Sequence, residues 1–169
     1  MAPVATPFFF YLLAAIMVIG GVAVITRKNP VHSALALIVT LLAQAAVYLM
    51  LYAPFVAGVQ IILYAGGIMV LFLFVIMLVS IERSIKERQF NSQWLIGIVA
   101  GALLGGLFVA AYTKGMNLFP EPPQALMEGD NTQRLASMLY GQYMFAFEIA
   151  SLLLLVAIIG AVVMAKKRI

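Results

Sequence analysis

The chain has 169 residues, of which 65% are hydrophobic and only 9% are charged. Soluble domains usually carry about 25% charged residues, so this composition excludes a water-soluble fold and indicates an integral membrane protein. The absence of cysteine excludes disulfides, thiolate catalysis and cysteine-ligated iron–sulfur clusters. The net charge of +4 comes from short basic clusters at the ends of apolar runs, a pattern that encodes membrane topology and not nucleic-acid binding.

The first two apolar runs are separated by a basic pair and a helix-start signal. The first run, residues 8–26, lacks the positively charged start of a secretory signal peptide, so we expect it to be retained as a membrane span. In "NPVHSALALI", which opens the second span, Asn29 is a good N-cap and Pro30 suits the first helical position.

The second and third spans form one uncharged stretch, residues 29–81. A single helix of that length would be about 80 Å long, whereas about 20 residues cross the hydrocarbon core. Pro54 therefore divides the stretch into spans at residues 31–52 and 55–81. Because the linker is only a few residues long, the two spans are predicted to form an antiparallel hairpin.

Two more spans are predicted at residues 94–112 and 142–165. The outer loop between them, residues 113–141, contains three prolines that argue against a continuous helix there. No soluble domain of appreciable size remains. The sequence therefore predicts a single all-α membrane domain of five transmembrane helices over residues 1–169.

The distribution of Lys and Arg predicts the orientation. With the N-terminus outside and the C-terminus in the cytoplasm, two basic residues, Lys114 and Arg134, lie on the outer side, and eight lie on the inner side. The inner residues are Arg27, Lys28, Arg83, Lys86, Arg88, Lys166, Lys167 and Arg168.

Polar residues interrupt the third span near its middle. Gln60, Tyr64 and Gly67 are spaced i, i+4, i+7, so an α-helix would place them on one face, which is expected to meet another helix or water. Gly66 and Gly67 weaken the helix at the same depth by about 1 kcal/mol each relative to alanine. Two interpretations stay open: close packing around small residues, or a π-bulge that changes the hydrogen-bonding register beside a polar path.

Other polar side chains in the spans have structural interpretations in addition to functional ones. Glu148 is the only acid within an apolar run, so it is a functional candidate, although its place near a helix N-terminus also suits the helix dipole. His32 is interpreted as an interfacial or packing residue. Gln44, Tyr48 and Tyr52 are spaced i, i+4, i+8 and indicate a packing face with interface anchors.

The fourth span carries Gly97, Gly101 and Gly105 at intervals of four, which predicts a groove that packs against another helix. The sequence has no paired intramembrane carboxylates, no membrane-embedded lysine or arginine, and no nucleotide or metal motif. We therefore expect no catalytic site and no metal site in this chain, which instead has the character of one part of a larger assembly.

Three segments carry a family resemblance. "NPVHSALALI", "GVQIILYAGGIMVLFLFVIMLV" and "NTQRLASMLYGQYMFAFEIASLLLLVAIIGAVV" closely resemble the subunit J family of NADH–quinone oxidoreductase, the bacterial counterpart of subunit 6 of mitochondrial NADH dehydrogenase in respiratory complex I. The resemblance covers essentially the whole chain. Members of the family often have a glycine–alanine pair where this chain has Gly66 and Gly67, and some have a glutamate where it has Gln60.

The resemblance implies a multi-pass subunit of the bacterial inner membrane, in the membrane arm with subunits A, H, K and N. Neighbouring subunits would bind the quinone, and partner subunits would hold the FMN and iron–sulfur clusters, with no cofactor in this chain. The third helix of the family is thought to switch between π-bulged and α-helical forms, gating a water path that couples quinone reduction to proton translocation. The matching residues are Tyr64, Ala65, Gly66, Gly67, Ile68, Met69 and Val70.

The leading interpretation is a gating subunit of that proton pump. Two alternatives stay open, a small subunit of a multi-component cation/proton antiporter and a purely structural assembly subunit.

Overall fold

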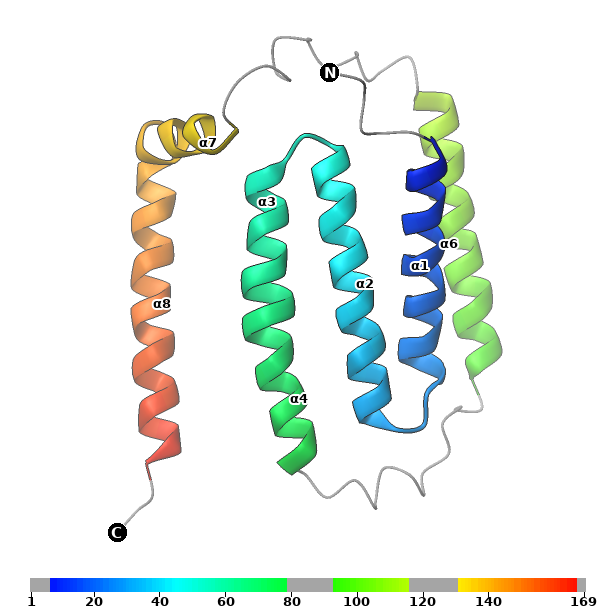
Figure 1. The fold of residues 1–169 in the computed structure, drawn as a ribbon, viewed down its shortest axis with the longest axis horizontal. Helices are drawn as coiled ribbons and strands as arrows, with labels where there is room; N and C mark the ends of the chain where they lie inside the picture. The colour runs from blue at the N-terminus through cyan, green and yellow to red at the C-terminus, as the bar shows by residue number, and fades with distance from the viewer. Residues whose placement is uncertain (1–6, 79–92, 116–130, 167–169) are drawn as a thin grey trace. The chain divides into compact units, whose positions relative to one another are not determined.

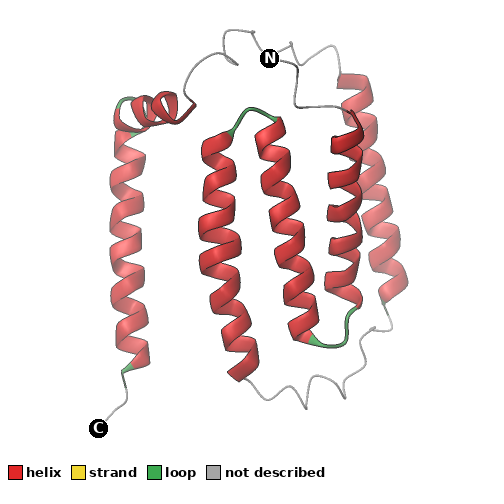
Figure 2. Ribbon diagram, viewed as in Figure 1, coloured by secondary structure: helices red, strands yellow, loops and turns green. Residues whose placement is uncertain are grey.

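The structure is a computed structural model that describes residues 7–78, 93–115 and 131–166, and every regular element in those residues is a helix (Figures 1 and 2). Five helical stretches are long and apolar enough to span a membrane, which confirms the five predicted spans. They are Pro7–Thr26, Pro30–Met50, Pro54–Leu78, Trp94–Lys114 and Met144–Ala165. The chain divides into two compact units, Met1–Glu128 and Gly129–Ile169.

The first connection joins α1 (Pro7–Thr26) to α2 (Pro30–Met50), and its local chemistry is the predicted one. Asn29 is the N-cap of α2, and its Oδ1 accepts a hydrogen bond of 2.9 Å from the backbone N–H of Val31. Pro30 occupies the first turn, where a missing N–H has no cost. The Ser33 hydroxyl donates to the carbonyl of Val24 and so ties the start of α2 to the end of α1.

The second connection is a tight turn that begins the third span. Tyr52 has a positive φ of 56°, which reverses the chain, and the Ala53 N–H donates to the Tyr48 carbonyl at 3.0 Å. Helix α3 (Pro54–Val59) then starts with Pro54 in its first turn. The predicted division at Pro54 is confirmed, and α2 packs along the whole third span in the predicted hairpin (Figure 1).

The third span is not one regular α-helix. Between α3 and α4 (Met69–Leu78) lies a nine-residue π-helical segment, η1 (Gln60–Ile68). At its end the Met69 N–H donates to the Tyr64 carbonyl, five residues back, where an α-helix would use the carbonyl four residues back.

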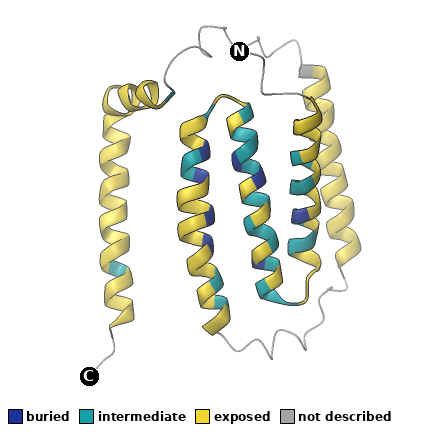
Figure 3. Ribbon diagram, in the orientation of Figure 1, coloured by how far each residue is buried: buried dark blue, intermediate teal, exposed yellow. Residues whose placement is uncertain are grey.

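Small residues form the core of the α1–α4 bundle (Figure 3). The buried apolar positions are Ala34, Ala43 and Ala45 on α2, with Ala57, Ala65 and Met69 on the third span. Without a hydrophobic drive between helices in lipid, close backbone approach through small side chains is what favours association. The large apolar side chains point outward instead, as expected for surfaces that face lipid or another subunit.

Helix α6 (Trp94–Gly115) follows the predicted fourth span and continues three residues beyond its expected end. The Thr113 hydroxyl donates to the carbonyl of Val109 at 3.0 Å, so the hydroxyl has a hydrogen-bond partner within its own helix. All residues from Trp94 to Lys114 are exposed.

The second unit consists of α7 (Asn131–Tyr140) and α8 (Met144–Ala165). The prediction of a loop over residues 113–141 is wrong for α7, since its ten residues contain no proline and the three prolines precede it, outside the described residues. The rings of Tyr140 and Phe147 meet edge to face at 5.4 Å across the corner between the two helices.

Gly20 sets the distance between α1 and α2, which generates a first prediction. A Cβ at this buried position would overlap the Oγ1 of Thr40, which donates to the Ala36 carbonyl at 3.0 Å. Gly20→Ala is expected to cost about 1–3 kcal/mol, as overpacking does. The thermal denaturation midpoint of the detergent-solubilised protein measures this loss.

Two variants control for the glycine itself. Gly21→Ala meets open space, so it should not lower the midpoint and should raise it slightly through its higher helix propensity. Thr40→Ala removes Oγ1 and leaves only ordinary contacts of 3.5 Å around a Cβ at position 20, so it should recover most of the loss when combined with Gly20→Ala. Equal midpoints for Gly20→Ala and Gly21→Ala would contradict the close approach.

Candidate functional site

A chain of three polar side chains joins α2 to the first residue of η1. The buried Gln60 donates from Nε2 to Oε1 of Gln44 at 3.3 Å, and Gln44 donates from Nε2 to the Tyr48 hydroxyl at 3.0 Å. Gln44 and Gln60 stand eight residues before and after Tyr52, so the antiparallel hairpin brings them to the same depth. The amides pair with each other and so avoid the cost of unpaired polar groups in hydrocarbon.

The π segment changes which residues of the third span face α2. Gln60, Ala65 and Met69 are buried, so the buried face advances by five residues within η1 and by four after it. Tyr64 is 49% exposed, and Gly67 is exposed as well. The predicted common face of Gln60, Tyr64 and Gly67 is therefore wrong, because Ala65, five residues after Gln60, takes the buried position that an α-helix would give to Tyr64.

The two glycines of η1 have different surroundings. A Cβ at Gly66 would lie 3.2 Å from the carbonyl oxygen of Ile61, five residues back, which is tighter than most real contacts. A Cβ at Gly67 would lie 3.8 Å from the carbonyl oxygen of Ile62, an ordinary contact. Within the π form, the position that favours glycine is thus Gly66.

The segment predicted to switch overlaps the observed π segment but is displaced from it. Tyr64 to Ile68 lie in the second half of η1, while Met69 and Val70 are the first residues of α4. The π segment also begins four residues earlier than the predicted segment, at Gln60.

The remaining candidates lie on helix ends and on α6 and α8. Glu148 is exposed on the second turn of α8, in the second unit, and His32 is exposed in the first turn of α2. Nothing lies within 4 Å of a Cβ built at Gly97, Gly101 or Gly105, so the groove on α6 is open.

The polar cluster consists of an amide pair and a phenol, which bind and orient but supply no strong acid or base. No group of three or more metal-ligand side chains occurs among the described residues. The cluster and η1 together therefore place polar side chains beside a helical segment of altered register within a membrane span.

Comparison with known proteins identifies the family. The family profile described as NADH-ubiquinone/plastoquinone oxidoreductase chain 6 matches residues 20–164. The chain belongs to this family. It is 38% identical over 166 residues to NADH-quinone oxidoreductase subunit J of Rhodobacter capsulatus, covering 93% of this chain and 80% of that protein.

Two further members of the family agree over similar lengths. Subunit J of Pseudomonas aeruginosa is 36% identical over 158 residues, which cover 91% of this chain and 93% of that protein. Subunit 10 of the Thermus thermophilus enzyme is 36% identical over 155 residues, which cover 87% of this chain and 82% of that protein. The family resemblance inferred from sequence is thus confirmed.

The pairing of Gln44 with Gln60 was not predicted, although a signal for it is present in the sequence. The sequence spacing places Gln44 on a packing face with Tyr48 and Tyr52, and Gln60 on a face with Tyr64. Both glutamines lie eight residues from Tyr52 in the turn before Pro54, and this equal spacing predicts that the hairpin brings the two amides together.

The two amides of the pair are expected to be coupled in their contributions to the stability of the bundle. Gln60→Leu leaves Gln44 without its donor, and Gln44→Leu leaves Gln60 without its acceptor, so each destabilises the bundle. The double variant should lose less than the two single losses combined, with a coupling of about 0.6 kcal/mol, the mean for such bonds in membranes. Denaturation of the four proteins in mixed detergent measures this coupling.

Tyr48→Phe serves as the control, because Gln44→Leu also removes the contact to the Tyr48 hydroxyl. Strictly additive losses for Gln44→Leu and Gln60→Leu would show that the pair does not hold the two spans together.

Proposed function

We propose that this chain is a membrane-arm subunit of a proton-pumping NADH–quinone oxidoreductase and that its third span couples quinone reduction to proton translocation. The observation that carries the coupling role is η1, a π-helical segment beside polar side chains within a membrane span. Family membership and relatives that are named subunits of this oxidoreductase support the assignment.

The proposal also specifies the membrane in which the chain lies, its orientation and its neighbouring subunits. It lies in the bacterial inner membrane as one multi-pass domain, with the N-terminus outside and the C-terminus in the cytoplasm, as the Lys and Arg distribution favours. Subunits A, H, K and N are its neighbours, neighbouring subunits bind the quinone, and the FMN and iron–sulfur clusters reside elsewhere in the complex. The exposed apolar surfaces of α6 and α8 suit contacts with those subunits or with lipid.

The gate is a change of helical register in η1. If η1 adopted α-helical bonding, the residues after it would rotate by about 100°, the angle of one residue. Tyr64 and Ile68 would then turn towards α2, in place of Ala65 and Met69. A phenol would enter the α2 interface next to the amide pair, which changes the polar lining between the two spans. Register changes of this kind often occur at functional sites.

The two adjacent glycines provide a matched test of the gate. Gly66→Ala and Gly67→Ala raise the intrinsic helix propensity by the same amount, but only Gly66→Ala presses a Cβ against a backbone carbonyl of the π form. We expect Gly66→Ala to favour the α form. A shift of about 1 kcal/mol changes the population ratio roughly fivefold.

Turnover and proton pumping are measured in the assembled complex in vesicles. The expected result is a several-fold loss of coupled quinone reduction in Gly66→Ala with near-normal rates in Gly67→Ala, at equal assembly. If both variants assemble and pump at the parental rate, the register of η1 is not a gate, and the subunit has a structural role. If the parental complex moves a cation without reducing quinone, the chain serves an antiporter instead.

Tyr64→Phe tests the part of the gate that changes the polar lining. Tyr64 is half exposed in the π form, and removing its hydroxyl leaves the ring and the packing of η1 intact. We therefore expect unchanged assembly and denaturation midpoint but lower coupled turnover of the complex. An unchanged turnover number would exclude a role for the hydroxyl, while leaving the register change to the glycine comparison.

A further inference from the structure

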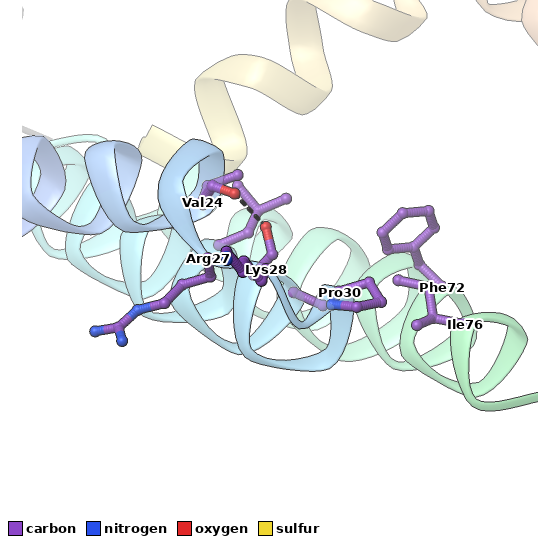
Figure 4. A pocket seen from close by; sticks show the side chains of 9 residues that line it. Val24, Arg27, Lys28, Pro30, Phe72 and Ile76 are labelled. Carbon is purple, nitrogen blue, oxygen red and sulfur yellow. Dashed lines mark hydrogen bonds between the residues drawn. The ribbon is translucent and has the colours of Figure 1, made fainter. Parts of the chain in front are cut away.

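A groove lies at the basic end of the α1–α4 bundle, between the α1–α2 connection and α4 (Figure 4). Its volume is about 370 Å³. Val24 comes from α1, Pro30 from the start of α2, and Phe72 and Ile76 from α4, so three helices contribute to its walls.

The lining of the groove is divided by polarity. Arg27 and Lys28 supply two cations at the end where α1 stops, and Leu37, Phe72 and Ile76 supply an apolar wall. The Ser33 hydroxyl is already engaged with the Val24 carbonyl, as the dashed line in Figure 4 shows. Among the described lining residues, both charges are therefore positive, and the rest of the lining is largely apolar.

The two cations have no anionic partner in their own bundle. Residues 7–78, which form α1 to α4, contain no Asp or Glu, and both basic side chains are exposed. Their positions directly after an apolar span place them at the depth of the lipid headgroups. Basic pockets between helices at the membrane surface attract anionic headgroups, and the attraction depends on salt.

We propose that this groove binds an anionic phospholipid, with its phosphate at Arg27 and Lys28 and the upper part of one acyl chain against Leu37, Phe72 and Ile76. Charge complementarity selects the anionic headgroup over a zwitterionic one, whose net charge is zero. The volume is in the range of small-ligand sites, so the groove takes the headgroup and the start of a chain, and the remainder of the lipid stays in the bilayer.

Photo-crosslinking in the assembled complex tests the site. The complex is reconstituted in phosphatidylcholine vesicles with a trace of phosphatidylglycerol that carries a diazirine on its acyl chain, and labelled peptides are mapped. We expect label on Leu37, Phe72 and Ile76, and much less when the same diazirine is carried by phosphatidylcholine. High salt should lower the phosphatidylglycerol label, because screening weakens the headgroup contact.

Charge variants identify the anchoring residues. Arg27→Gln with Lys28→Gln should lower the label by about fivefold for each charge removed. Lys28→Arg keeps the charge and should retain the label. Lys114→Gln removes a cation at the end of α6, outside the groove, and should also retain it.

Neutralising a basic pair also affects topology, so one variant keeps both charges. Ile76→Trp fills the apolar end of the groove and should abolish the label on Leu37 and Phe72. Persistence of that label in Ile76→Trp would overturn the proposal even if the doubly neutralised chain failed to assemble.

Three other outcomes also overturn it. One is equal labelling by the two lipids, and another is phosphatidylglycerol label that is insensitive to Arg27→Gln with Lys28→Gln in assembled complex. The third is label confined to a neighbouring subunit, which would mean that protein and not lipid covers the groove. All of these outcomes are labelling patterns and not turnover rates, so the lipid site and the proposed gate can fail separately.

Discussion

Hydrocarbon offers no hydrogen-bond partner to a buried amide, and this constraint determines how the second and third spans pack. Gln60 is buried in the interface and pairs with Gln44 at the same depth of the hairpin. The pairing requires the two backbones to lie close together, which the buried alanines on both helices permit. Because Gln60 is the first residue of η1, the same contact anchors the point from which the π segment departs from α-helical phase.

Features of the fold that depend on local chemistry could be predicted from the sequence. The lengths of the apolar runs predict five spans, and the cap at Asn29 and the break at Pro54 follow from the properties of single residues at helix ends. Helix α7 was not predicted, because the effect of the prolines was extended over the whole outer loop, including the ten residues after Gly129 and Asp130 that contain none.

The candidate site could be predicted only in part. The need of Gln60 for a partner follows from its chemistry alone, and the weakness of the backbone follows from the paired glycines. The placement of Tyr64 failed, because it assumed 3.6 residues per turn, and no apolar pattern reveals that a segment bonds five residues back. The difference between Gly66 and Gly67 likewise concerns that bonding, since it comes from the distances to carbonyl oxygens five residues back in the π form.

The extra residue in η1 has a consequence beyond the middle of the membrane. The register of η1 sets the rotation of the helix that follows it, so it also sets the directions in which Phe72 and Ile76 on α4 point. If η1 exchanges between the two registers, as proposed, the apolar wall at the basic end and the amide pair share that conformational equilibrium. Any ligand that prefers this wall stabilises the π register by its differential affinity, and by reciprocity the π register raises affinity for that ligand. In that case, the balance between the two registers of the third span depends on the lipid composition of the membrane.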